Sequence, residues 1–350
     1  MVSVSTNHER KLTKCFNSEL KAFKFLFLAY LFVSFQLSAQ QTATSAKDVQ
    51  QALEQKQNMA KTSLVKNVPF TNIGPTIMSG RVVDFAVNPE NPTEFYVAYA
   101  SGGLWYTNNN GTSFTSLTEN APTQNMGDID VDWKSGTIWI GTGESNSSRS
   151  SYAGIGILKS TDQGKTWNNV GLTDTHHIGR LIVNQNNPDE VIVGAIGHLY
   201  TSNAERGIFK TKDGGKTWNK VLFVNEDTGI IDINVSPTNP SVMYAASWER
   251  HRKAWDFDGD GENSAIYKST DAGDTWTKLT NESSGFPTGN GVGRIGVSAF
   301  SDDVVYALLD NQFRRPSQSD GGSEGLQKDE FKKMSNADLL ALDNKKLESC

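Results

Sequence analysis

The sequence predicts an all-β protein, and within that class a β-propeller built from four-stranded blades. The first observation is a phrase, "KSTDAGDTWTKL" at 268–279, that returns as "KSTDQGKTWNNV" at 159–170 and "KTKDGGKTWNKV" at 210–221. A looser copy, "YTNNNGTSFTSL", occupies 106–117. The second observation is that each copy lies in a unit of about fifty residues with four short runs rich in Val, Ile, Tyr and Trp. Units of this length and content are typical of propeller blades.

Each unit begins with a glycine and an alternating apolar run, which predicts the first strand of a blade. These first strands start near residues 80, 127, 179, 229 and 293. The fifth unit holds only its first two strands, so residues 69–313 predict an incomplete propeller of about four and a half blades. Residues 70–73 have the pattern of a fourth strand without a blade of its own, of the kind that closes the ring. We therefore expect an amino-terminal fragment of a longer protein, whose remaining blades are its partners.

The first 39 residues predict a signal peptide. Lys21 and Lys24 precede the apolar run at 25–35, and small residues follow it. The alternative is an uncleaved membrane anchor, for which this run is short. We expect an exported protein, secreted or held in the periplasm or at the cell surface, with no stable membrane association after cleavage.

Two further segments flank the predicted blades. Residues 40–68 predict a polar linker or helix. Residues 314–350 predict a flexible loop and a short carboxy-terminal helical insertion, with Ser335 in the N-cap position.

Composition excludes several classes of function. The net charge is −6, which argues against general nucleic-acid binding. The two cysteines are Cys15, inside the predicted signal peptide, and Cys350, so neither an internal disulfide nor a thiolate metal site is expected. No cofactor motif occurs.

One acidic stretch suggests calcium. "DFDGDGE" at 256–262 offers Asp256, Asp258 and Asp260, but the EF-hand spacing then requires Glu where Tyr267 stands. Calcium is therefore a weak expectation, and a solvated acidic loop is the alternative.

The repeated phrase has the chemistry of a turn. Its Asp accepts backbone N–H groups across a tight hairpin, its Gly takes positive φ, and its Trp buries a ring between sheets. A catalytic acid is needed once per enzyme and not once per blade, so we interpret these residues as structural. The set comprises Asn109, Phe114, Asp162, Gly164, Trp167, Asp213, Gly215, Trp218, Asp271, Gly273 and Trp276.

Strand alternation places the repeated turns on one face of the propeller and the longest loops on the other. Arginine and aromatic side chains in those loops, and arginines at the starts of first strands, suit sugars or extended peptides. The predicted ligand-binding residues are Arg81, Arg149, Arg180, His198, Tyr200, Trp248, Arg250, Trp255 and Arg294. Two alternatives remain open: the loops pack on one another, or the strand-start arginines form ion pairs between blades.

Residues 69–316 resemble the secreted Asp-box, or BNR-repeat, proteins labelled as glycosyl hydrolases or as sortilin-like propellers. "GTGESN" at 141–146 and "ERGIFKTKDGGKTW" at 205–218 carry much of that resemblance. In the xyloglucanase-type members of this group, the resemblance implies a catalytic Asp where this chain has Ala100. Glu144 and Asp128 are then only weak catalytic candidates.

We therefore favour binding over catalysis for this chain. The expected function is binding of a carbohydrate or peptide through the face opposite the repeated turns, as a scaffold or receptor. The alternative is part of a glycoside hydrolase whose catalytic half lies beyond residue 350.

Overall fold

The structure, a computed structural model, describes residues 44–68, 80–147, 151–253, 255–313 and 334–342. The predicted signal peptide at 1–39 and the predicted closing strand at 70–73 lie outside the described residues.

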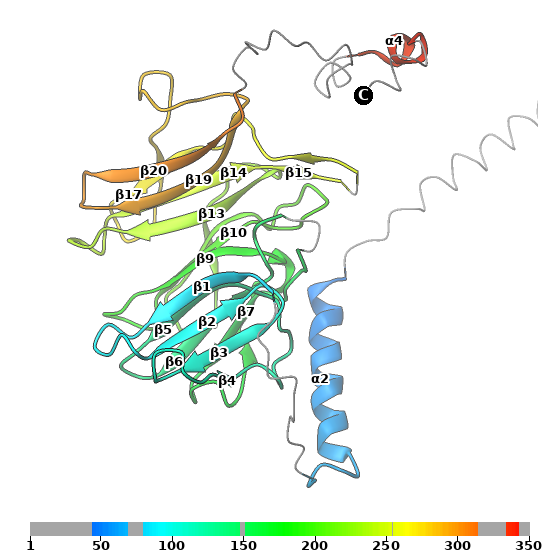
Figure 1. Cartoon of the computed structure of the whole chain (residues 1–350), viewed down its shortest axis with the longest axis vertical. Coiled ribbons are helices and arrows are strands. Elements are labelled where there is room, and N and C mark those ends of the chain that lie inside the picture. The colour runs from blue at the N-terminus through cyan, green and yellow to red at the C-terminus, as the bar shows by residue number, and fades with distance from the viewer. Residues whose placement is uncertain (1–43, 69–79, 148–150, 254, 314–333, 343–350) are drawn as a thin grey trace, which may run out of the picture.

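The fold-class prediction is confirmed: four antiparallel four-stranded sheets follow one another along the chain, and a two-stranded sheet comes last (Figure 1). Blade 1 contains β1 Val82–Val87, β2 Phe95–Tyr99, β3 Gly103–Thr107 and β4 Thr115–Ser116. Blade 2 contains β5 Met126–Asp132, β6 Thr137–Thr142, β7 Ile157–Ser160 and β8 Asn168–Asn169. Blade 3 contains β9 Ile178–Val183, β10 Val191–Ala195, β11 Gly207–Thr211 and β12 Asn219–Leu222. Blade 4 contains β13 Thr228–Val235, β14 Met243–Glu249, β17 Ile266–Ser269 and β18 Thr277–Lys278. Blade 5 contains β19 Val292–Ala299 and β20 Val305–Asn311.

Sequential antiparallel pairing gives the blades two distinct faces. The repeated turns join the third and fourth strands at one end of each blade, which we call the turn face. The links between blades and the loops between second and third strands lie at the other end, the loop face. The longest of these loops, between β14 and β17, carries a small hairpin of β15 His251–Arg252 and β16 Phe257–Asp258, where the sequence had suggested only a loop.

Short helical segments accompany the sheets. The α2 helix, Ala46–Thr62, has Ser45 as its N-cap and buries none of its residues. In Figure 1 it runs beside the blades on the same side as β15, and Gln50 Nε2 donates to Asn169 Oδ1 at 3.2 Å. A 3₁₀ turn, η1 Thr173–Thr175, links blades 2 and 3, and α4 Asn336–Leu340 starts at a Ser335 capping box. Within the described ranges, no helix has the length and apolar character needed to cross a bilayer.

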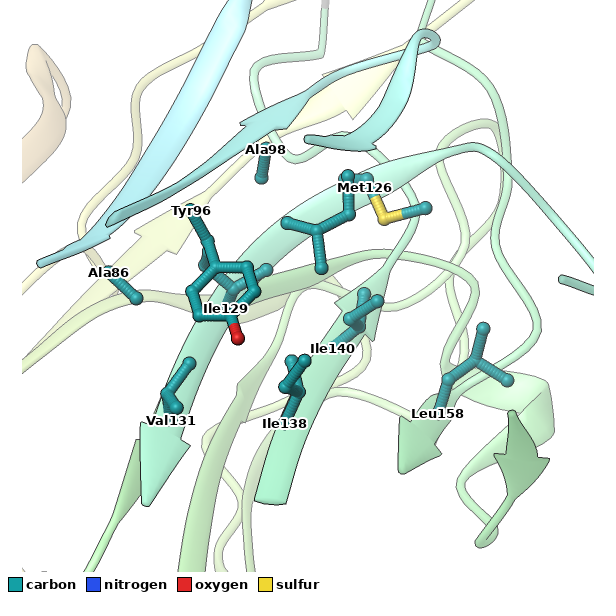
Figure 2. Close-up of a cluster of buried hydrophobic side chains, with 10 residues drawn as sticks. Ala86, Tyr96, Ala98, Met126, Ile129, Val131, Ile138, Ile140 and Leu158 are labelled. Atoms are coloured by element: carbon teal, nitrogen blue, oxygen red, sulfur yellow. The ribbon is translucent and has the colours of Figure 1, made fainter. Parts of the chain in front are cut away.

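The hydrophobic core lies between neighbouring blades and is divided among their interfaces. Between blades 1 and 2, for example, Tyr96 and Ala98 pack with Met126, Ile129 and Ile138 (Figure 2). Similar clusters fill each of the next three interfaces. Each sheet is therefore stabilised by its neighbours, as in other radially repeated β folds.

Glycines at the strand starts allow the first strands of neighbouring blades to approach closely. A Cβ on Gly127 would lie 2.3 Å from the carbonyl oxygen of Ile178, and one on Gly179 would lie 2.6 Å from that of Ile230. No side chain fits at such distances, which explains the glycines at these two strand starts.

The first and last blades expose apolar side chains. Phe85 on β1 is 59% exposed, and Leu308 on β20 is 81% exposed. Neither side chain belongs to any of the hydrophobic clusters that the described residues form between blades.

Candidate ligand-binding site

The turn face is built from four copies of one hydrogen-bonded turn. In the third copy, Thr211 Oγ1 accepts the Gly215 N–H at 3.0 Å and donates to Asp213 Oδ1 at 2.8 Å. Asp213 also accepts the N–H and the hydroxyl of Thr217, at 2.9 and 2.6 Å. The equivalent turns start at Thr107, Ser160 and Ser269. In the first copy the Asn109 amide takes the place of the carboxylate and accepts the Ser113 N–H at 3.0 Å.

The aspartate carboxylates of the repeated turns accept hydrogen bonds from residues of the same turn. Hydrogen bonds from Thr166 and Ser160 lower the pKa of Asp162 to about 2, and those from Thr275 and Ser269 lower the pKa of Asp271 to about 2. Donors that satisfy an anion stabilise its charged form, so these groups are suited to holding a turn and not to exchanging protons.

The tryptophans of the repeat connect blades. Trp167 Nε1 donates to the Leu117 carbonyl at 2.9 Å, and Trp218 Nε1 donates to the Val170 carbonyl at 2.8 Å. In both cases the acceptor belongs to the preceding blade. Trp276 differs, because its Nε1 donates to Gly273 within its own turn at 3.1 Å. Phe114 of the first copy packs edge-on against Phe95.

The first strands are joined around the centre by carboxylates that accept backbone N–H groups of a neighbouring blade. The contacts run from Ile129 to Asp84, from Leu181 to Asp128 and from Val297 to Asp232, at 3.2, 2.6 and 2.9 Å. These aspartates face the middle of the propeller, and we call this set the axial carboxylates.

Arg180 lies among the axial carboxylates. Its Nη1 is 3.1 Å from Asp128 Oδ1 and 3.6 Å from Asp84 Oδ1, and its Nη2 is 3.0 Å from Asp232 Oδ1. Its partners therefore come from blades 1, 2 and 4. The negative charge around it, chiefly that of Asp128, raises the pKa of Arg180. Arg180 therefore forms ion pairs between blades, which is one of the two alternatives left open for the arginines at the strand starts.

A second polar group, which we call the loop-face cluster, contains Arg81, Glu144, Asn146 and Arg294 from blades 1, 2 and 5. Arg81 Nη2 lies 2.8 Å from Glu144 Oε1, and Asn146 Nδ2 donates to the same oxygen at 2.9 Å. Arg294 Nη1 donates to Asn146 Oδ1 at 2.5 Å. Arg81 is 48% exposed at its side chain, so the cluster reaches solvent.

The two weak catalytic candidates are both enclosed. The Glu144 side chain is fully buried, and its second oxygen accepts the Ser151 hydroxyl. Asp128 is 2% exposed, and its two oxygens face Arg180 and the Leu181 N–H. Burial raises the pKa of Asp128, and the charge of Arg180 opposes that rise. Neither carboxylate is presented to a substrate.

Three histidines connect the links between blades. His177 Nδ1 lies 2.8 Å from the Glu144 carbonyl oxygen, so it supports the strand end that carries the loop-face cluster. His176 stacks on His198 with ring centroids 3.9 Å apart. His198 Nε2 is 2.9 Å from the Asp174 carbonyl, so this predicted ligand residue packs against the neighbouring link.

The remaining predicted ligand residues divide into exposed and buried ones. Tyr200 and Trp255 are 55% and 84% exposed, whereas Trp248 and Arg250 are buried. Trp248 Nε1 donates to the Gly259 carbonyl at 2.7 Å. Arg149 lies outside the described residues.

The acidic loop shows no metal centre in the described part of the chain. No group of three His, Cys, Asp or Glu side chains is arranged to hold an ion there. Asp260 Oδ2 accepts the Gly291 N–H at 2.7 Å and so joins the β16–β17 loop to the start of blade 5.

Sequence reasoning missed Asp84, Asp232 and Asn146. The signal for the two aspartates was present, because "VVDFAV" and "GIIDIN" each place one carboxylate in an otherwise apolar first strand. Buried charges are rarely left without partners, so such a residue indicates a contact across the channel. Asn146 gave no comparable signal.

Part of the chain is similar to known proteins. The family model described as "Sortilin, neurotensin receptor 3" matches residues 156–319. A curated relative, a probable oligoxyloglucan-reducing end-specific xyloglucanase of Neosartorya fischeri, is 28% identical over 140 residues, covering 37% of this chain and 15% of the relative.

One solved structure shows the same fold. An ancestral GH74 enzyme matches with a TM-score of 0.50 at 20% identity, covering 69% of this chain and 30% of the enzyme. The GH74 enzyme of Niastella koreensis matches with a TM-score of 0.47 at 19% identity, covering 65% of this chain and 35% of the enzyme. The chain thus spans about a third or less of these relatives. The chain is a β-propeller, and its residues 156–319 are similar to the sortilin family model.

Proposed function

We propose that this chain is an exported propeller segment that binds a carbohydrate through its loop face, as a scaffold or receptor. The observation that carries the proposal is the loop-face cluster, in which Arg81, Asn146 and Arg294 from three blades meet around Glu144. Guanidinium and amide groups held in fixed positions are suited to the hydroxyl and ring oxygens of a sugar.

The Trp248 ring lies 5.9 Å from Arg294 Cζ and supports that guanidinium. One observation favours a sugar over a peptide. The curated relative is named for its action on oligoxyloglucan, a carbohydrate. A peptide ligand remains the competing possibility and is included in the test.

The test is a binding titration of the whole chain with xyloglucan oligosaccharides, followed by calorimetry. Arg81→Met and Arg294→Gln should each weaken binding about tenfold, equivalent to about 1.4 kcal/mol. Lys216→Gln is the matched control, because it removes one exposed positive charge from the turn face. Equal affinities of all three variants, or binding of peptides and not of any glycan, would contradict the proposal.

A second candidate, part of a glycoside hydrolase, is favoured by the xyloglucanase match. A retaining or inverting hydrolase needs two carboxyl groups that flank the bond to be cleaved. Glu144 and Asp128 are both buried, and Ala100 stands where the resemblance would require Asp. Reducing-end release from the same oligosaccharides distinguishes the candidates, because turnover that is lost in Glu144→Gln or Asp128→Asn would establish catalysis in this chain.

A further inference from the structure

A separate cavity of about 160 Å³ lies on the loop face between the loops of blades 3 and 4. The residues around it are strongly cationic: Arg206, Arg250, Arg252 and Lys253 line it, with Asp227 as the one acidic side chain among the lining residues. A cavity this small accommodates one group of a ligand and not a whole oligosaccharide.

Arg250 is the most unusual of these residues. It is 1% exposed, and its Nε and Nη1 atoms have no hydrogen-bond partner among the described residues. Its guanidinium carbon lies 5.6 Å from the Trp248 ring, which supports the side chain without neutralising it. Burial, together with the charge of Arg206, lowers the pKa of Arg250.

Arg206 places a second buried guanidinium at the same cavity. It is also 1% exposed, and the acceptors of its Nη groups are backbone carbonyls of Asp227, His198 and Thr201. Its Nε, like that of the half-buried Arg252, has no partner in the described part of the chain.

The nearby carboxylate is already engaged. Asp227 Oδ1 accepts the Ser202 hydroxyl and lies 3.7 Å from His251 Nδ1. No ion pair within 4.0 Å joins Arg206, Arg250 or Arg252 to an acidic side chain among the described residues. Buried guanidinium groups without an anion are costly, since desolvation is not offset by charge pairing.

We propose that this cavity binds the oxyanion of an acidic sugar, with Arg250 and Arg252 as its principal ligands and Arg206 as a positioning residue. Planar guanidinium groups bind carboxylate or sulfate oxygens through two parallel hydrogen bonds. Tyr200 lines the cavity and is 55% exposed, so its ring offers a face against which a sugar packs. That the ligand is a sugar rests on the proposed function, because the cavity lies on the same loop face. That the ligand is an anion rests on the arginines of the cavity alone.

The test measures the melting temperature of the whole chain with D-glucuronate, glucose 6-sulfate, glucose, acetate and a tri-glutamate peptide, at constant ionic strength. Glucuronate or the sugar sulfate should raise the melting temperature by about 3 °C at tenfold excess over its dissociation constant. The two arms distinguish a carboxylate source from a sulfate source. Glucose and acetate should give little or no shift at the same concentrations.

Three variants test whether the shift in melting temperature depends on the arginines of this cavity. Arg250→Met should abolish the shift while leaving the melting temperature without ligand unchanged or higher, because it removes an unpaired buried charge. Arg252→Gln lies at the half-buried rim, should fold normally, and should reduce the shift by at least half. Lys216→Gln on the turn face should retain the full shift.

Three outcomes would overturn the proposal: no shift with either acidic sugar, a shift retained in both arginine variants, or a shift produced by tri-glutamate but by neither acidic sugar. Should Arg250→Met fail to fold, Arg252→Gln alone decides. Loss of xyloglucan binding in Arg81→Met leaves this test unaffected, so the failure of one proposal is distinguishable from the failure of the other.

Discussion

Arg180 Nη1 and Asp128 Oδ1 lie 3.1 Å apart and join the first strands of blades 2 and 3 at the centre of the propeller. Asp128 is 3% exposed at its side chain, whereas Arg180 is 35% exposed. The same guanidinium also contacts Asp84 and Asp232, so one cation lies among three carboxylates. Removing it would leave buried negative charges facing one another.

The first prediction concerns the loss of the Arg180 charge from among these carboxylates. Arg180→Met should lower the free energy of unfolding by roughly 2–3 kcal/mol, below the full range for buried pairs because Arg180 is partly exposed. Urea denaturation measures the change. Arg81→Met is the matched comparison and should have a smaller effect, since Glu144 keeps hydrogen bonds from Asn146 and Ser151. An Arg180 variant as stable as the native chain would contradict the structural role.

The second prediction concerns the hydroxyl that closes each repeated turn. Thr211 is fully buried, and its Oγ1 accepts the Asp213 and Gly215 N–H groups. Thr211→Val keeps the shape but leaves those donors without an acceptor, which should cost about 1–3 kcal/mol of stability. Thr211→Ser should restore it. Denaturant unfolding measures both variants, and glycan affinity should not change because this turn lies on the face opposite the loops.

The third prediction tests the close approach of neighbouring first strands. Gly179→Ala places a Cβ 2.6 Å from the Ile230 carbonyl oxygen, so the sheets must separate, at a cost of about 1–3 kcal/mol or more. Gly296→Ala is the control on the first strand of blade 5, where the nearest atom is Asp232 Oδ2 at 3.8 Å. That variant should change stability by no more than about 0.5 kcal/mol. Similar melting temperatures for the two variants would refute this account of the strand-start glycines.

The fourth prediction concerns Asp130. Its carboxyl accepts the Val131 and Val183 N–H groups, both at 2.8 Å, yet burial raises its pKa to about 6. The folded state therefore binds a proton that the unfolded state, with a pKa of 3.8, does not. Stability from this group rises as pH falls from about 7 to about 4, by about 2 kcal/mol. Asp130→Asn should remove this change of unfolding free energy with pH, measured by urea titrations at successive pH values. An unchanged pH dependence in the variant would contradict the prediction.

The fifth prediction concerns His177, whose titration changes stability with pH in the direction opposite to that of Asp130. Burial, and next the charge of Arg250, lower the pKa of His177 to about 3. The unfolded state takes up a proton below pH 6.5 that the folded state does not, so stability is lost as pH falls from 6.5 towards 3. An NMR titration should show His177 neutral at pH 5. A midpoint near 6.5 in the folded protein would disprove the assignment, and His177→Gln should flatten the stability profile in this window.

The sequence by itself determined the fold class and the register of the blades. A phrase repeated in register, with alternating strands around it, specifies local turns and strand order, because both depend on residues close in the chain. The glycine at each strand start was visible for the same reason. The role of Trp167 was only partly visible, because its indole N–H bonds to Leu117, 50 residues earlier.

The tertiary structure alone decided what the polar residues do. Arg81, Arg180 and Arg294 occupy equivalent positions at their strand starts, yet Arg180 is enclosed by three carboxylates while the other two meet around Glu144 and Asn146. Likewise, the sequence shows Arg250 as one loop residue among several. Only the tertiary structure shows that it is buried and that two of its guanidinium nitrogens have no hydrogen-bond partner among the described residues. Charge environment depends on contacts between distant blades, and no local pattern records those contacts.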